Sequence, residues 1–133
     1  MGSEELLSLI ASGYRLEAKL EATLAPLGLS LAKLNVLTHL AESHRSLALG
    51  EIAAKLQCVR SNVTQLIDRL EADGLVRRLY DPADRRTVRA ELTDVGRERQ
   101  TKGAEAIARA GNDIAAALPA DDLAALRRLS AVL

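Results

Sequence analysis

The sequence predicts a mainly α-helical protein with one small β-ribbon, in which a winged helix-turn-helix core is flanked by helices at both ends. Three observations predict this fold. Apolar residues recur at helical spacing over most of the 133 residues. Two short helical segments, 49–56 and 60–73, are joined by a tight connection. Between 75 and 93, apolar and polar residues alternate on both sides of a turn at Asp81-Pro82-Ala83, which predicts two paired strands.

The first two helices are predicted from their apolar stripes and from the residues at their ends. In segment 4–25, the apolar positions 6, 10, 16, 20 and 24 lie roughly on one side, and Pro26 and Gly28 end the pattern. Ser30 is a suitable N-cap for a helix over 31–42, with leucines 34, 37 and 40 facing inward. The polar segment 43–46 predicts a loop.

The middle of the chain predicts the helix pair and the ribbon. Segments 49–56 and 60–73 both repeat apolar residues at i, i+3, i+4 and i+7, and Gly74 is suited to a left-handed helix end. Strands are expected at 75–80 and around 88–92. Thr93 can cap a helix over about 94–117, Pro119 ends it, and Asp121 or Asp122 begins the last helix.

Composition limits the classes of function. With 18 basic and 18 acidic residues the formal net charge is zero, so contact with nucleic acid requires local clustering of charge. Cys58 is the single cysteine, which excludes an intrachain disulfide and fits a reducing compartment. The acidic start MGSEELLSLI does not resemble a signal peptide, and no apolar run reaches the ~20 residues of a membrane span. We therefore expect a cytoplasmic protein without a membrane partner.

Helix 60–73 is the expected recognition helix, because its outward face carries short hydrogen-bonding groups and arginines that suit the DNA major groove. The wing adds arginines that suit phosphates or a narrow minor groove, and Asp84 could hold the Arg86 guanidinium in position. Residues 60–90 contain seven arginines, including Arg78 and Arg89, and five acidic residues. The predicted DNA-contacting residues are Arg60, Ser61, Asn62, Thr64, Gln65, Arg69, Arg77, Asp84, Arg85 and Arg86.

The outer helices, 4–25 and 94–133, are rich in Leu and Ala and are far apart in the sequence. They have no obvious core of their own. Helices of this kind can bury their apolar stripes against each other and against a second copy of the chain. The sequence therefore predicts a homodimer in which these helices form the dimerisation region, while residues 30–93 form the DNA-binding lobe.

The segments LGEIAAKL and NVTQLIDRLEADGLVRRLYDPADRRTVRAELTDVG, with Asp84, Arg86, Leu92 and Thr93 at a fixed spacing, resemble the MarR family of bacterial transcription regulators. The resemblance covers essentially the whole chain, 1–133, as one domain. It implies a homodimeric repressor on a pseudo-palindromic operator, with the recognition helix in the major groove and Arg86 in the minor groove. It also implies release of the DNA by a small anionic or phenolic effector, or by an oxidant. Val59 departs from the pattern, since many relatives have Ser there.

Residues for an effector are harder to predict. Tyr14 and Arg15 on the first helix and His39 on the second are candidates, because Arg15 could bind a carboxylate through two hydrogen bonds. A redox-responsive repressor that uses Cys58 is an alternative. A free cysteine also commonly replaces a buried apolar residue, and we prefer that interpretation.

Two further classes of function agree less well with the sequence. An enzyme requires a nucleophile and base, a metal cluster or a phosphate loop, and the sequence contains no motif for any of them. Two histidines and one cysteine make a poor set of metal ligands, so neither a metal nor a cofactor is expected. A winged-helix module that binds protein and not DNA is the remaining alternative, although the wing arginines and the polar helix face argue against it.

Overall fold

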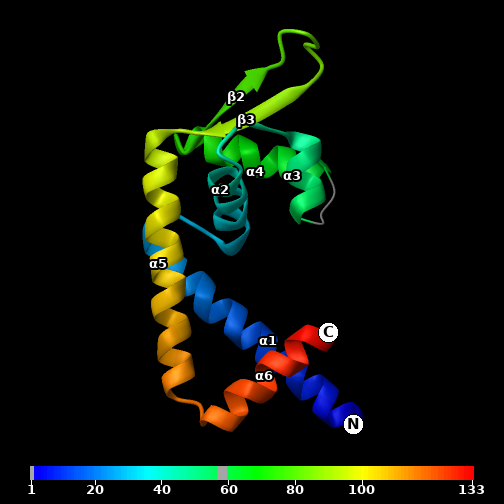
Figure 1. Ribbon diagram of the computed structural model, residues 1–133, viewed down its shortest axis with the longest axis vertical. Helices are drawn as coiled ribbons and strands as arrows, with labels where there is room; N and C mark the ends of the chain where they lie inside the picture. The colour runs from blue at the N-terminus through cyan, green and yellow to red at the C-terminus, as the bar shows by residue number, and fades with distance from the viewer. Residues whose placement is uncertain (1, 57–59) are drawn as a thin grey trace.

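The computed structural model describes residues 2–56 and 60–133. In these ranges the chain forms helices and a small sheet in the predicted order, which confirms the mainly helical class (Figure 1). The elements are α1 Ser3–Leu24, the 3₁₀ turn η1 Ala25–Leu27, α2 Leu31–Ser43, β1 Leu47–Ala48, α3 Leu49–Leu56, α4 Arg60–Ala72, β2 Val76–Tyr80, β3 Val88–Leu92, α5 Asp94–Ala116 and α6 Ala120–Val132.

The elements gather at two ends of the molecule. At one end lie α2, α3, α4 and the sheet, and at the other lie the N-terminal part of α1 and the whole of α6. The long helix α5 connects the two ends (Figure 1). The predicted DNA-contacting segments are therefore at the opposite end from the helices that were expected to dimerise.

An aliphatic core holds the first end together. It comprises side chains from α2, α3, α4 and the sheet, together with Leu24 from the end of α1. The largest fully buried side chains are Leu24, Val36, Leu37, Leu40, Leu47, Ile52, Val63, Ile67, Leu70, Leu75 and Val76. Burial of such side chains contributes about 1.5–3 kcal/mol each, and this core therefore fixes the orientation of α4.

The sheet has three strands where the sequence predicted two. Its order is β1-β3-β2, with both pairs antiparallel. The missed strand is β1, in which Leu47 pairs with Ala90 and Ala48 pairs with Arg89. Two residues are too few to show alternation, so this pairing is set by tertiary contacts. Between β2 and β3 the register runs from Val76 opposite Leu92 to Tyr80 opposite Val88.

Several helix ends are set by the residues that the sequence singled out. The Ser30 hydroxyl accepts the backbone N–H of Lys33 at 3.1 Å, and the Thr93 hydroxyl accepts that of Gly96 at 3.0 Å. Gly74 has a φ of 75°, the left-handed conformation that was expected after α4. The last helix begins one or two residues earlier than expected, with Pro119 at its N-cap.

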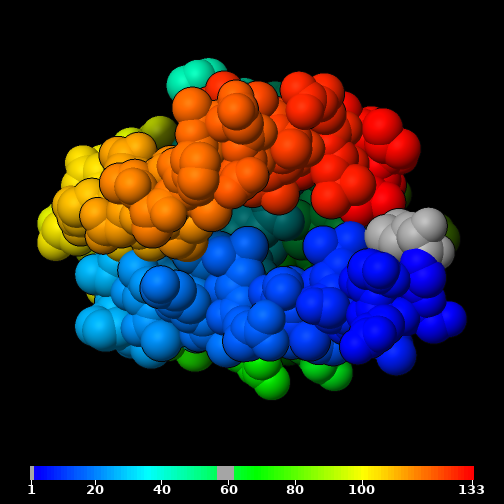
Figure 2. Space-filling view, turned by 90° about the horizontal axis from the view of Figure 1, so that it is seen from below, coloured from blue at the N-terminus to red at the C-terminus, as the bar shows by residue number. Residues whose placement is uncertain are grey.

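The apolar stripe of α1 is largely exposed. Other described parts of the same chain therefore do not cover it. Leu24 is fully buried, but Leu6, Ile10 and Leu16 are 46%, 54% and 46% exposed. On α6, Leu126 and Leu129 are exposed as well. Viewed from this end, α1 runs along one side and the end of α5 with α6 along the other (Figure 2).

The described residues contain neither a single membrane-spanning helix nor a cluster of metal ligands. Within 2–56 and 60–133, no single helix is long and apolar enough to cross a membrane, although α1 with η1 and α2 pass that test as a pair bent by 70°. Over the same ranges, no group of three or more His, Cys, Asp or Glu residues could hold a metal ion.

Candidate nucleic-acid interface

Helix α4 has one buried and one exposed side, as the sequence predicted. Val63, Ile67 and Leu70 are fully buried against the core. The candidate residues Asn62, Thr64, Gln65 and Arg69 are exposed. Arg60 begins the helix and Ser61 follows it, but their side chains lie outside the described part, as do residues 57–59 with Cys58 and Val59.

Three of these exposed residues share one flank of α4. Asn62, Gln65 and Arg69 line an open hollow of about 360 Å³ together with residues of α2 and α3, including Asn35. Their spacing of three and four residues places them on one side of the helix. The sequence therefore identified a row of polar side chains that the fold leaves accessible along the recognition helix.

The tip of the wing is shaped by aspartates. Asp81 accepts the backbone N–H of Ala83 at 2.9 Å, and Asp84 accepts the backbone N–H of Arg86 at 3.0 Å. Asp84 also accepts the Thr87 hydroxyl at 3.3 Å. The carboxylate of Asp84 thus holds the backbone of the turn, whereas the sequence had suggested that it holds the Arg86 guanidinium. Asx hydrogen bonds of this kind stabilise tight turns.

Arg85 and Arg86 project from this turn and are exposed. Within the described residues, neither guanidinium forms an ion pair. The aspartates of the turn bond to its backbone and to Thr87, so both guanidinium groups remain available to an external anion. The turn therefore presents the chemistry that phosphate or the minor groove would bind.

The other wing arginines, Arg77, Arg78 and Arg89, are paired with acidic side chains of the protein. The Arg77 Nε atom donates to Glu91 at 2.7 Å, directly across the β2–β3 ladder. The Arg78 guanidinium donates to Glu71 at 3.0 Å and to Asp68, both on α4. Because successive residues of a strand point to opposite faces, Arg77 lies on the face of the ribbon away from α4.

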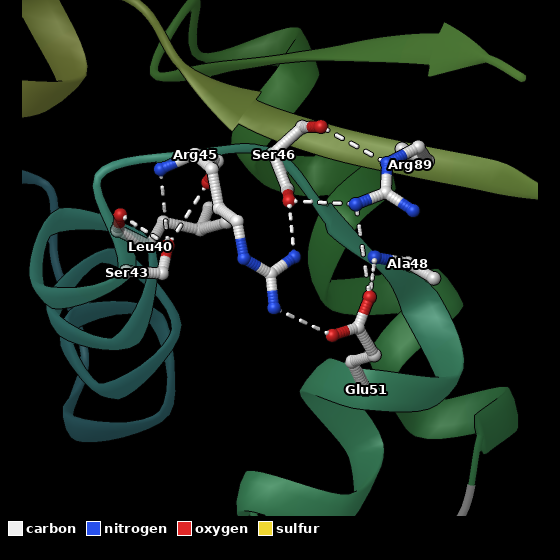
Figure 3. Close-up of polar contacts among 7 residues, drawn as sticks. All are labelled: Leu40, Ser43, Arg45, Ser46, Ala48, Glu51 and Arg89. Atoms are coloured by element: carbon white, nitrogen blue, oxygen red, sulfur yellow. Dashed lines mark hydrogen bonds and ion pairs between the residues drawn. The ribbon is translucent and has the colours of Figure 1, made fainter.

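Arg89 belongs to a network at the base of the wing that sequence reasoning missed (Figure 3). Its guanidinium donates to the Ser46 hydroxyl at 3.0 Å and to the Ser46 carbonyl at 2.9 Å. Arg45 donates to the same carbonyl and to Glu51, each at 3.0 Å. Glu51 also accepts the backbone N–H of Ala48 at 3.1 Å, so one carboxylate joins β1 to the first turn of α3.

The pKa of Glu51 is lowered from its ordinary value of 4.5 by these contacts, above all by the hydrogen bond from Arg45 and then by that from the Ala48 N–H. The carboxylate therefore stays ionised at neutral pH. The only sequence signal for this network was the polar segment 43–46, which had been assigned to a loop. Tertiary contacts, not local sequence, bring its members together.

The structure does not assemble the predicted effector residues into one site. Tyr14 is 69% exposed, and Arg15 donates to the Ser12 hydroxyl of its own helix at 2.9 Å. His39 is half-buried on α2. A separate hollow of about 230 Å³ lies between α1, α5 and α6, and apolar residues such as Leu16, Leu20 and Ile114 line it. None of the three predicted residues lines this hollow.

The fold and the exposed groups define a winged helix-turn-helix protein. A MarR family model matches residues 29–88, which contain the helix pair and most of the wing. The chain is 35% identical to the transcriptional repressor MdtR of Bacillus subtilis over 94 residues, covering 71% of this chain and 60% of MdtR. It spans between 32% and 60% of the length of the curated relatives that it matches first.

Solved structures extend the similarity to nearly the whole chain. The repressor CouR bound to a 23-mer DNA duplex is 29% identical, with a TM-score of 0.83 over 94% of this chain and 88% of CouR. A cysteine-to-serine mutant of MarR from Escherichia coli, complexed with operator DNA, is 26% identical, with a TM-score of 0.81 over 97% of this chain and 94% of that one.

This chain belongs to the MarR family of winged helix-turn-helix transcriptional regulators. Membership of a family of regulators confirms the expectation that it is not an enzyme.

Proposed function

We propose that this chain is a homodimeric repressor that binds a pseudo-palindromic operator and is released from it by a small molecule. In this proposal α4 lies in the major groove, where the outward residues Asn62, Thr64 and Gln65 meet base edges. Arg86 enters the adjacent minor groove, and Arg69 and Arg85 meet phosphates. Arg60 and Ser61, at the start of α4, belong to the same expected contacts. A regulator of transcription works beside the chromosome, so we place it in the cytoplasm.

One observation carries the DNA-binding part of the proposal. The exposed polar side of α4 and the unpaired arginines of the wing turn lie at the same end of the molecule (Figure 1). A recognition helix beside a ribbon with cations at its tip matches two neighbouring DNA grooves. Two similar structures, those of CouR and the MarR mutant, contain bound DNA, which supports the same use of this end.

The proposal of a homodimer is supported by exposed apolar side chains at the end of the molecule opposite to α4. Six large apolar side chains of α1 are at least 38% exposed there, and α6 together with Leu133 after it adds four more. Exposed apolar surface of this extent is typical of an interface. A second copy that covered both helices would bury it, and it would place two copies of α4 on one side for a two-fold operator. The exposed residues are Leu6, Leu7, Leu9, Ile10, Tyr14, Leu16, Leu126, Leu129, Val132 and Leu133.

The effector part rests on the apolar hollow between α1, α5 and α6. A pocket lined by aliphatic groups suits the ring of a phenolic compound. Because it is lined by the C-terminal half of α5 and by the helices proposed to dimerise, a bound ligand there could change the distance between the two copies of α4. The test is a thermal-shift screen of aromatic acids and phenols, since a ligand that binds only the folded state raises the melting temperature.

DNA binding is tested by titrating the purified chain against duplex DNA from upstream of its own gene over a series of salt concentrations. Arg69, Arg85 and Arg86 form no ion pair among the described residues, so a dimer would bring up to about six of these charges to the DNA, and log K should fall with log salt at a slope of roughly −5. Arg86→Gln should weaken binding and reduce this slope while leaving the melting temperature unchanged. No salt-sensitive complex would refute the proposal and favour a protein-interaction module.

Dimerisation is tested by the molar mass of the chain in sedimentation equilibrium. Ile10→Glu places a charge in the proposed interface, and burying an unpaired charge is costly. We expect the wild-type chain to sediment as a dimer and Ile10→Glu to sediment at the monomer mass. Glu17→Gln, which changes an exposed polar side chain of the same helix, serves as the control. If the wild-type chain sediments as a monomer, the proposed dimer is refuted. The DNA-binding test does not depend on this result.

A further inference from the structure

Arg78 joins the recognition helix to the wing. It lies in the middle of β2 and reaches back to two acidic residues of α4, Asp68 and Glu71. Its Nη1 atom donates to Glu71 Oε1 at 3.0 Å and its Nη2 atom donates to Asp68 Oδ1. Its backbone N–H donates to the second oxygen of Glu71, also at 3.0 Å. Main chain and side chain of one residue thus hold the same helix.

The position of this contact allows it to set the angle between α4 and β2. Between the end of α4 and the start of β2 lie only three residues, and Leu75 among them is fully buried. This connection fixes where α4 and β2 meet. Arg78, two residues into β2, then fixes how far they open, because beyond it the ribbon leaves the core and continues to the wing turn.

The Arg78 side chain is more shielded than a typical surface ion pair. It is 19% exposed, whereas its neighbour Arg77 is 61% exposed. Hydrogen bonds to two carboxylates, Asp68 first and then Glu71, raise the pKa of the guanidinium, so it remains charged. Ion pairs held by two partners and partly removed from water are stronger than single exposed pairs. This contact is therefore suited to hold an angle, unlike the exposed pair at Arg77.

We propose that Arg78 is a positioning residue for DNA recognition: by tying β2 to Asp68 and Glu71 it sets the angle between α4 and the wing, so that α4 and Arg86 enter neighbouring grooves together. This inference rests on the proposed function. It assigns Arg78 a role that differs from that of Arg86, because its guanidinium donates to acidic side chains of the protein and not to phosphate.

The alternatives make different predictions for a double-mutant cycle. If Arg78 positions the wing, Arg78→Gln already removes the contribution of Arg86, and adding Arg86→Gln costs little more. If Arg78 contacts DNA by itself, the two losses are additive. If Arg78 only stabilises the fold, the affinity per folded dimer stays at the wild-type value. Affinities are therefore measured on the upstream duplex, with the folded fraction determined from circular dichroism.

We expect Arg78→Gln to weaken binding roughly ten- to a hundred-fold, the range for the loss of one groove contact. Lys102→Gln is the control. It removes one positive charge from an exposed ion pair with Glu98 on α5, outside α4 and the wing, and it should change affinity by less than about three-fold, as for an exposed pair. The double variant Arg78→Gln/Arg86→Gln should bind no more than about two-fold more weakly than Arg78→Gln alone.

A charge exchange provides a second test. In Arg78→Glu/Glu71→Arg the pairing between β2 and α4 is restored with reversed polarity, and the net charge is unchanged. We expect it to regain most of the wild-type affinity, which Arg78→Glu alone should lack. If Arg78→Gln does not fold, Glu71→Gln replaces it in the cycle, because it removes one of the two carboxylates and leaves Asp68 in place.

Additive losses in the cycle, wild-type affinity per folded Arg78→Gln dimer, or a folded charge-exchange variant that binds no better than Arg78→Glu would each overturn the positioning role. In all three cases wild-type binding persists, so the proposed function would stand. If the wild-type chain itself does not bind, both proposals fall together.

Discussion

Replacing Gly96 by alanine should destabilise the protein, because the start of α5 packs closely against the backbone of Leu75, the residue before β2. Gly96 lies in the first turn of α5, where its N–H donates to Thr93. A Cβ atom at this position would lie 1.9 Å from the carbonyl oxygen of Leu75 and 2.8 Å from its carbonyl carbon. To reach even the 3.0 Å that real Cβ atoms respect, the two backbones must separate by 1.1 Å, the difference between 3.0 and 1.9 Å.

The expected change in unfolding free energy follows from the contacts that this separation disturbs. Forcing an extra methyl group into packed atoms costs typically about 1–3 kcal/mol, and a backbone neighbour cannot rotate away, so the upper part of that range applies. The Leu75 carbonyl also accepts the N–H of Thr93 at 3.1 Å, and weakening that hydrogen bond costs about 1 kcal/mol. Alanine regains about 1 kcal/mol over glycine in a helix. The net loss is about 2–3 kcal/mol of unfolding free energy, from the same three terms.

The assay is urea unfolding followed by circular dichroism at fixed protein concentration, with Gly50→Ala as the matched control. Gly50 lies in the first turn of α3, and a Cβ there meets no atom within 4 Å. Gly50→Ala should leave stability unchanged or raise it by up to about 1 kcal/mol. Equal unfolding midpoints for Gly96→Ala and the wild type would show that the close contact between Gly96 and the Leu75 backbone does not exist.

Two further predictions concern polar contacts. In Glu51→Gln, stability should fall less steeply than in the wild type as the pH is lowered. The folded-state pKa of Glu51 is lowered, so its stabilising contribution is present above its ordinary value of 4.5 and is lost as the pH falls through the lower folded-state pKa. The prediction is wrong if the melting temperatures of Glu51→Gln and the wild type fall in parallel from pH 7 to about pH 3. Thr93→Ala should cost about 1–2 kcal/mol, since the hydroxyl caps α5 and donates to the Gly74 carbonyl at 2.7 Å. Thr93→Ser keeps both hydrogen bonds and should unfold at nearly the wild-type urea concentration.

The helices were predictable because their signals are local. Ser30 and Thr93 cap the helices that follow them, and Gly74 adopts the left-handed conformation at the end of α4. The short helix α3, expected at about 49–56 from its apolar spacing, is present over Leu49–Leu56. The strand β1 was missed because its two residues become a strand only by pairing with β3, which lies about forty residues away in the sequence.

The apolar stripe of α1 shows a different limit. Periodicity identified which residues share a side of the helix, and it did so correctly for Leu24. It does not say what covers that side. Leu6 and Ile10 lie beyond the part of α1 that contacts the core and remain exposed, although their spacing is the same. The same pattern thus serves an internal core at one end of the helix and, in our proposal, a second copy of the chain at the other.

Charge could be counted from the sequence but not assigned. Residues 60–90 contain seven arginines and five acidic residues, which suggested a modest excess of positive charge spread along the wing. In the structure Arg77, Arg78 and Arg89 hold acidic residues on β3, α4 and α3, and two of these partners, Glu51 and Glu91, lie outside that interval. The excess is therefore concentrated on the unpaired side chains of α4 and the wing turn. Since the whole chain is neutral, we propose that these few side chains, together with the angle at which the paired ones hold the wing, determine how the protein binds DNA.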